Sequence, residues 1–291
     1  MSWLRDATDR AMVESVVVGT LAGAIGVQIV LRRLAFFTMT MTHATFPGVV
    51  AAAVVGINIY LGGALVGLLV TLAVVALGRR RGQDLTTATG VLLSAGFALG
   101  VALAAAQQGF TRNLSAYLVG AILTVSDADL VTGAAVCVVV LAVLFAAGKE
   151  LRFAGFDPDG ARAAGYRTRL LDLLLLLLVE AVVVVVIPAV GTILALALLV
   201  APASAARLWT DRPGPTTGLA VAFGVASSVA GLALSSRYDL AAGATISLVA
   251  TGVLGGSLLA APRHGVLARP TSFRRSRANP RDWRSTNDDL P

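Results

Sequence analysis

The most polar stretch inside any apolar segment of this sequence is an alternation of threonine and methionine that contains a histidine. Met39 and His43 lie in it four positions apart, which puts both side chains on one face of an α-helix. A neutral imidazole is a good ligand for first-row divalent metals, and a thioether is a softer, weaker one. The pair therefore indicates either a metal site or a histidine that hydrogen-bonds a neighbouring helix.

A lone carboxylate interrupts the longest aliphatic segment. Glu180 lies between a run of leucines and a run of valines, about eleven residues beyond Arg169. At about 1.5 Å per residue this depth is near the middle of a bilayer, where a charged side chain is costly. Glu180 is therefore a candidate metal ligand, a candidate proton carrier, or a hydrogen-bond partner for another helix.

Helix signals also occur in the polar segment that precedes Arg169. Asp157 suits an N-cap, Pro158 the first helical position and Gly165 a helix stop. The spacing predicts a short helix within residues 156–165. Such a helix either docks a motor subunit or merely connects two longer helices.

Other residues suggest helix breaks and caps. Pro47 with Gly48, and the segment 188–191, are expected to interrupt helices within the membrane, where freed carbonyls can line a pathway. Asp127 and Asp129 fit a helix N-terminus, as cap and dipole partners, better than they fit a site for a metal or a partner protein.

The composition predicts that a bilayer surrounds these residues. Of 291 residues, 57% are hydrophobic and 13% are charged, whereas soluble domains carry about 25% charged residues. The apolar residues form runs of about 20, long enough to cross a hydrocarbon core of about 30 Å. The sequence predicts an all-α, polytopic transmembrane bundle in residues 1–261, with about eight or nine spanning helices. The apolar segments are 11–31, 35–55, 59–78, 88–106, 128–148, 169–187, 189–208, 216–235 and 242–261.

Arginine placement predicts the orientation of the bundle. Arginines cluster at the ends of apolar segments and in the C-terminal tail, as in cytoplasmic loops of membrane proteins. This pattern predicts a cytoplasmic C-terminus, and nine crossings would leave the N-terminus outside. Residues 262–291 are rich in arginine and proline and poor in apolar side chains, which predicts a disordered cytoplasmic tail. The tail either touches anionic lipid headgroups or is a solvated appendage.

The motifs that are missing exclude several function classes. The sequence contains no G-x-x-x-x-G-K-[ST] nucleotide loop, no HExxH and no G-x-S-x-G elbow. The net charge of +7 comes from arginines at the expected membrane edges and does not indicate nucleic-acid binding. The single cysteine, Cys137, gives no disulfide framework and no cysteine-based zinc site. We expect a protein that is not an enzyme, and any ATP that drives it must bind another chain.

Five stretches of the sequence form an ordered series of motifs. They are Leu31 to Phe37 with Thr42 to Ala44 and Pro47 to Gly48, then Val125 to Leu130, Phe156 to Gly165, Val200 to Arg212, and Asp239 to Ile246. In that order they resemble the permease subunits of the manganese, zinc and iron ABC importers, the family called ABC-3. The resemblance extends over about residues 17–259.

The resemblance implies an importer subunit integral to the cytoplasmic membrane. It implies a homodimer within the lipid bilayer, cytoplasmic ATP-binding subunits on which ATP is hydrolysed, and an extracytoplasmic metal-binding protein that delivers the ion. The transported ion would be manganese first and zinc second, with no covalently bound cofactor and no nucleic-acid partner. The residues that match the coupling helix, which contacts the ATPase, are Phe156, Asp157, Ala161, Arg162 and Gly165.

The resemblance also assigns the ion pathway. Metal contact falls to His43, with Met39 at the position where many family members carry an aspartate. Either Glu180 or a carboxylate from elsewhere replaces that aspartate, or the ion passes without tight coordination. A His–Met pair suits a hard ion such as manganese less well than a His–Asp pair does. Pathway or structural roles fall to Pro47, Gly48, Pro202 and Asp239. The alternatives are a siderophore or vitamin importer permease, a proton-coupled secondary transporter, and a membrane scaffold without transport.

Overall fold

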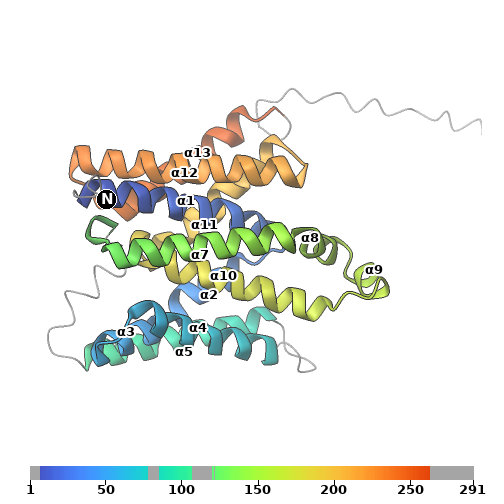
Figure 1. Cartoon of the computed structure of the whole chain (residues 1–291), viewed down its shortest axis with the longest axis horizontal. Coiled ribbons are helices and arrows are strands. Elements are labelled where there is room, and N and C mark those ends of the chain that lie inside the picture. The colour runs from blue at the N-terminus through green and yellow to red at the C-terminus, as the bar shows by residue number, and fades with distance from the viewer. Residues whose placement is uncertain (1–6, 78–84, 107–119, 121, 263–291) are drawn as a thin grey trace, which may run out of the picture.

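The computed structural model describes residues 7–77, 85–106, 120 and 122–262, and every regular element among them is helical. The helices lie roughly side by side (Figure 1). In chain order they are α1 (Ala7–Leu31), α2 (Ala35–Ala44), α3 (Phe46–Val55), α4 (Ile59–Leu77), α5 (Leu85–Ala105), η1 (Ile122–Thr124, a 3-10 turn), α7 (Asp127–Ala146), α8 (Gly148–Phe156), α9 (Pro158–Ala163), α10 (Thr168–Val190), α11 (Thr192–Trp209), α12 (Pro213–Tyr238) and α13 (Ala242–Ala260).

The length and composition of these helices confirm the predicted class, an all-α polytopic membrane protein. Within the described part of the chain, eight helical segments are long and apolar enough to cross a membrane, with 35–55 counted as one segment. A shorter apolar helix, Leu194–Trp209, forms most of α11. The predicted eight or nine spans therefore correspond to helices observed in the structure.

Two groups of helices are joined by α10 (Figure 1). One group contains α1, α11, α12 and α13, and the other contains α2, α3, α4 and α5. Helix α10 contacts α1, α7 and α11 on one side and α2 and α4 on the other. Beyond Asp172 its side chains are apolar on every face apart from Glu180, which is typical of a helix at the centre of a bundle. Most of its residues from Leu175 to Val190 are buried.

The predicted interruption within the segment 188–191 is present, and the structure places it at the last of these residues. Helix α10 continues through Pro188 to Val190, and the chain breaks at Gly191, where φ is 91°. Glycine adopts this left-handed conformation without steric cost, so Gly191 marks the boundary between α10 and α11. The break near Pro47 is slight, because Thr45 alone separates α2 from α3.

The segment that precedes the short helix is also helical, although the sequence predicted a helix only within residues 156–165 of this polar segment. Helix α8 buries Gly148, Leu151 and Ala154, which recur every three residues along one face. Two of these side chains are small, so the apolar stripe is weak in the sequence and becomes evident only once α8 packs against α7 and α10. Below, the end of the bundle that carries α8 and α9 is called the α9 end, and the other is called the opposite end.

Candidate ion pathway and coupling site

The side chains of α2 divide between two neighbouring helices. His43 is half-buried, and its ring meets that of Phe97 of α5 edge to face, with ring centres 5.3 Å apart. Met39 lies one turn earlier on the same face and is also half-buried. Met41 faces α4 instead, where the Thr71 hydroxyl lies 3.7 Å from its sulfur, and it is fully buried. Met39 and His43 thus lie one turn apart in the same helix, α2.

Glu180 occupies a different contact, between α10 and α4. It is 4% exposed, and neither carboxylate oxygen has a hydrogen-bond partner. The carboxylate lies against Gly67 of α4, where an added Cβ would overlap it. Thr71 lies one turn from Gly67 on the same face of α4. Glu180 of α10 packs against this face at Gly67, and Met41 of α2 packs against it at Thr71.

The structure does not combine the predicted metal residues into one chelating group. His43 and Met39 face α5, while Glu180 faces α4. Among the residues that the structure describes, no three His, Cys, Asp or Glu side chains lie close enough to hold a metal ion. In this conformation the candidate ligands thus form two separate positions along the bundle.

The short helix at the α9 end has the predicted capping. The Asp157 carboxylate accepts a hydrogen bond of 2.8 Å from the Gly160 amide, and Pro158 occupies the first helical position. Gly165 follows the helix with φ of 87°, a conformation that favours glycine. Ala161 is fully buried and holds α9 against its surroundings. Phe156 belongs to the end of α8 instead and is 73% exposed.

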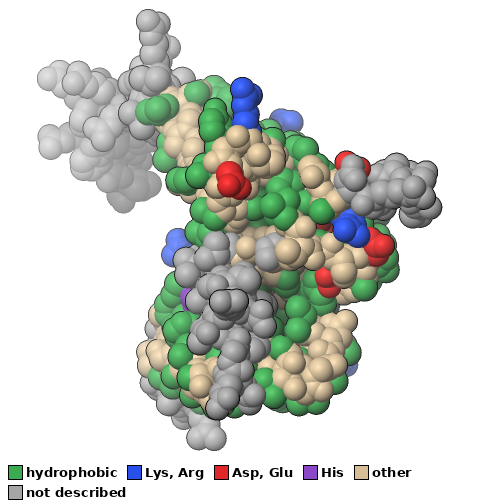
Figure 2. All heavy atoms as spheres, turned by 90° about the vertical axis from the view of Figure 1, so that its left-hand side faces the viewer, with side chains coloured by type: hydrophobic (Ala, Val, Ile, Leu, Met, Phe, Trp, Pro, Cys, Tyr) green, Lys and Arg blue, Asp and Glu red, His purple; other side chains and the backbone are tan. Residues whose placement is uncertain are grey.

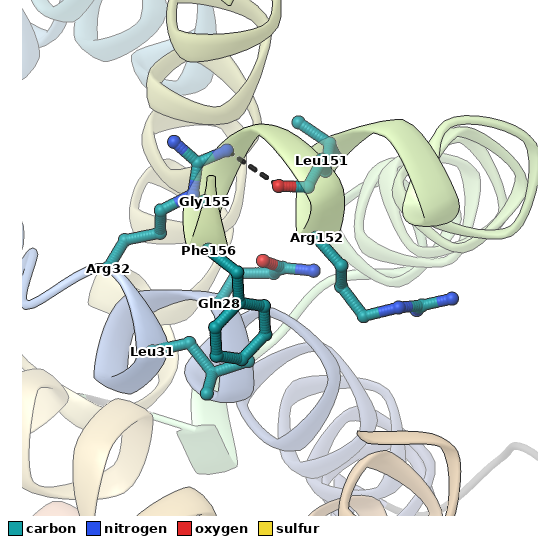
Figure 3. Close-up of a pocket in the computed structure, with 7 residues that line it drawn as sticks. All are labelled: Gln28, Leu31, Arg32, Leu151, Arg152, Gly155 and Phe156. Atoms are coloured by element: carbon teal, nitrogen blue, oxygen red, sulfur yellow. Dashed lines mark hydrogen bonds between the residues drawn. The ribbon is translucent and has the colours of Figure 1, made fainter. Parts of the chain in front are cut away.

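Arg32 connects this element to the helices that carry the candidate ligands. Its guanidinium pairs with Asp172 of α10 at 2.6 Å and donates a hydrogen bond of 2.7 Å to the carbonyl of Leu151 in α8. Figure 3 shows Arg32 reaching from α1 to the α8 backbone, with Phe156 lying over Leu31. Helix α2 begins three residues after Arg32, so the residue that bonds α8 and α10 also lies next to the helix that carries His43 and Met39.

A cavity adjoins the same element. It has a volume of about 140 Å³ and lies between α1, the end of α11 and the start of α12, with Phe156 on its rim. Its polar lining comes from Arg207, Thr210, Asp211 and Thr216. The exposed aromatic ring of Phe156 therefore lies at the junction of three helix ends.

The remaining predicted residues have visible structural roles. Pro47 lies in the first turn of α3, and Gly48 faces Gly62 of α4 so closely that a Cβ on either residue would overlap the other helix. Pro202 is buried within α11. Asp239 ends α12 in the left-handed conformation with φ of 52° and is exposed. For Gly48 and Asp239 these positions favour packing and turn formation over contact with an ion.

The opposite end holds a charged residue that the sequence analysis missed. The expected cap is present, since Ser126 and Asp129 form a reciprocal capping box at the start of α7. Acidic and basic side chains lie among apolar ones on this end of the molecule (Figure 2). Beneath the surface, Glu14 of α1 is 2% exposed. The available signal was a carboxylate inside the first apolar segment, but near its start, where a charged group is ordinary.

Comparison with protein families matches residues 5–261 to the ABC 3 transport family. The chain belongs to this family. It is 33% identical to the manganese transport system membrane protein MntC of Halalkalibacterium halodurans over 260 residues, which cover 89% of each protein. It is 34% identical to the zinc transport system membrane protein TroC of Treponema pallidum, over 87% of this chain and 90% of that protein.

A solved structure has the same fold as this ABC 3 family chain. It is that of PsaBC from Streptococcus pneumoniae in complex with Fab, with a TM-score of 0.82 and 30% identity, and the match covers 88% of this chain and 92% of that chain. The predicted family and the predicted permease architecture are both confirmed. An inward-facing metal-chelate type ABC transporter matches with a TM-score of 0.69 at 16% identity, which supports the fold alone.

Proposed function

We propose that this chain is the membrane-spanning subunit of an ATP-driven importer for a divalent transition-metal ion, with manganese as first candidate and zinc as second. The observation that carries the proposal is the match to the ABC 3 transport family along nearly the whole membrane part. Relatives in which the match covers nine-tenths of the protein are named as manganese or zinc transport proteins. The sequence has no nucleotide-binding loop, so ATP must be hydrolysed on a partner subunit.

The expected assembly is a homodimer with cytoplasmic ATP-binding subunits and an extracytoplasmic metal-binding protein. Support for ATPase contact comes from α9, an exposed and capped short helix at one end of the bundle. Phe156, Asp157 and Arg162 are exposed there and available to a partner. Arg32 ties the neighbouring α8 to α1 and α10, so a partner that moves α9 also pulls on the transmembrane helices.

The charge distribution supports a cytoplasmic position for the α9 end. Cationic residues concentrate in cytoplasmic loops of membrane proteins. The α9 end carries Arg32, Arg33, Lys149, Arg152, Arg162, Arg167, Arg169, Arg207 and Arg212. The opposite end carries few cations among its described residues, namely Arg10 and Arg237. The cytoplasmic C-terminus proposed from the sequence agrees with this distribution, because α13 ends on the same side as α1 and α11 do.

The ion pathway we propose has two positions. His43 and Met39 form one on the α5 side of α2, and Glu180 forms the other against α4. An imidazole and a thioether suit an ion of intermediate softness, and a carboxylate suits manganese as well as zinc. Two separate, incomplete ligand sets bind an ion weakly at each position, which suits transport because the ion must also be released.

Uptake of radioactive manganese and zinc tests the proposal. Cells would express this chain with its candidate ATPase, and His43→Ala would be compared with wild type at equal amounts of inserted protein. Met39→Leu and Met41→Leu form a matched pair, because both remove a thioether from α2 but only Met39 shares the face of His43. We expect His43→Ala to abolish uptake and Met39→Leu to lower it more than Met41→Leu does. No ATPase-dependent uptake of either ion in any variant would contradict the proposed function.

A proton-coupled secondary transporter is the second candidate, and one observation favours it. Both oxygens of Glu180 are buried without partners, which suits a carboxyl group that binds and releases a proton. That mechanism requires uptake without any ATPase, and Asp157→Ala should then be harmless. Under the importer proposal, Asp157→Ala removes the N-cap of α9 and lowers ATPase-dependent uptake.

A further inference from the structure

A second buried carboxylate lies outside the proposed pathway. Glu14 of α1 is 2% exposed, and its Oε2 has no hydrogen-bond partner. The carboxylate points at Gly133 of α7, where an added Cβ would lie 3.3 Å from each of its two oxygens. The space that a side chain at position 133 would fill is thus occupied by the unpaired, buried carboxylate of Glu14.

Two more oxygen ligands lie beside it. Asp129, one turn before Gly133 on α7, is close enough to repel the Glu14 carboxylate electrostatically. Tyr60, at the start of α4, lies beside Asp129 and within electrostatic range of Glu14. Glu14, Asp129 and Tyr60 are named the Glu14 cluster below. Asp129 and Tyr60 are half-buried while Glu14 is buried, so the cluster leads inward from the surface of the opposite end.

No cation of the described chain neutralises Glu14. Arg10 lies one turn earlier on α1, but its guanidinium pairs with Asp127 at 3.3 Å. On the deeper side, Glu14 interacts with Cys137 of α7, an uncharged thiol in its ordinary form. Two neighbouring carboxylates, one of them buried, repel each other, and burial penalises the charged form further. A bound cation removes both penalties at once.

The geometry points to a divalent-cation site at the Glu14 cluster, in which Glu14 and Asp129 supply carboxylate oxygens and Tyr60 supplies its hydroxyl. An all-oxygen set with open positions for water suits hard ions such as Mn²⁺, Mg²⁺ and Ca²⁺. In the proposed importer this is where an arriving ion first meets buried ligands. That role rests on the proposed function, whereas ion binding itself needs neither ATP nor transport.

Binding of Mn²⁺ to the full-length chain in lipid nanodiscs tests the site. The electron paramagnetic resonance signal of free Mn²⁺ gives the number of bound ions and their affinity. We would compare wild type, Glu14→Gln and Asp127→Asn, all in a His43→Ala background that removes the proposed pathway site. Asp127 is the matched control, because it is an acidic residue in the same turn as Asp129 but pairs with Arg10. We expect Glu14→Gln to weaken Mn²⁺ binding at least tenfold and Asp127→Asn to leave it within twofold.

A second variant keeps the test decisive if Glu14→Gln folds poorly. Gly133→Ala keeps both carboxylates but adds a methyl group 3.3 Å from the Glu14 oxygens, so it should also weaken binding. Mn²⁺ binding that is equal in wild type, Glu14→Gln and Gly133→Ala would overturn the site. Because no ATPase is present, this failure is distinct from a failure of ATP-dependent uptake.

Discussion

Glu14 and Glu180 are both buried carboxylates that face a glycine on a neighbouring helix, yet their surroundings differ. Glu180 lies between α10 and α4 among aliphatic side chains, and both of its oxygens lack partners. Glu14 lies between α1 and α7, close to a second carboxylate and a phenol. A Cβ added at Gly67 would overlap the Glu180 carboxylate, whereas a Cβ added at Gly133 would lie 3.3 Å from the Glu14 oxygens and only crowd them.

The comparison shows that burial alone does not define what a carboxylate in a membrane helix can do. Glu14 has two half-buried neighbours with oxygen ligands, Asp129 and Tyr60, between it and the surface of the opposite end. Glu180 is 4% exposed and packs against Gly67 of α4, with no hydrogen-bond partner for either oxygen. The position of Glu14 suits equilibrium binding of an ion, and the position of Glu180 suits a step that is driven by conformational change.

Glu180→Gln should have the largest effect on manganese uptake. If it had no effect, the contrast drawn between Glu180 and Glu14 would fail. The amide keeps the size of the side chain but removes the charge that an ion would meet. We expect manganese uptake to fall at least tenfold, a loss equivalent to about 1.4 kcal/mol, at every ion concentration. Glu14→Gln should lower uptake only at low ion concentration, since it affects capture alone. Uptake rates measured over a range of concentrations separate the two patterns, and full uptake by Glu180→Gln would remove this residue from the pathway.

Gly67→Ala should be the most destabilising change at either glutamate. The new methyl group overlaps the Glu180 carboxylate in a closely packed interface, and overpacking of this kind costs about 1–3 kcal/mol. The free energy of unfolding, measured on the purified chain, should fall by that amount. Glu180→Ala in the same chain should restore most of the loss, because the two residues are in contact and couple in a double-mutant cycle. Equal losses in the single and double variants would show that the carboxylate is not confined by α4.

The spanning helices could be predicted from the sequence, because run length and charge depletion directly reflect the bilayer. The capping of α9 was also predictable, since Asp157, Pro158 and Gly165 act through local backbone geometry. The break in the segment 188–191 was predictable too, but local signals did not say which of its residues would end the helix. Helix α10 passes through Pro188, and Gly191 ends it.

The candidate site was harder to predict, because it depends on which helix faces which. The shared face of Met39 and His43 followed from helical periodicity. That Glu180 faces α4, apart from His43, follows only from the packing of α10 between two groups of helices. Glu14 was missed for the same reason, since its burial arises when α7 covers it.

Ser126→Ala should have a moderate effect confined to the Glu14 region. The Ser126 hydroxyl accepts a hydrogen bond from the Asp129 amide and donates one of 2.7 Å to the Asp129 carboxylate. Loss of an N-cap typically costs about 1 kcal/mol, so the free energy of unfolding should fall by about that much. Freed from Ser126, the Asp129 carboxylate gains freedom to turn toward Glu14, and Mn²⁺ affinity should change while uptake by the Glu180 position stays normal. Thr132→Ala is the control, because Thr132 is a half-buried residue of the same helix whose hydroxyl donates to the Ala128 carbonyl and not to Asp129.

Gly133→Ala is the counterpart of Gly67→Ala, because both add a methyl group to a glycine that faces a buried glutamate. It should have the smallest effect on stability. Alanine favours a helix over glycine by about 1 kcal/mol, which offsets a contact of 3.3 Å that the flexible Glu14 side chain can relieve. We expect the free energy of unfolding to change by less than about 0.5 kcal/mol, while Mn²⁺ binding at the Glu14 cluster weakens. A loss as large as that of Gly67→Ala would mean that Glu14 is held as rigidly as Glu180, and the distinction between an accessible and an enclosed carboxylate would then fail.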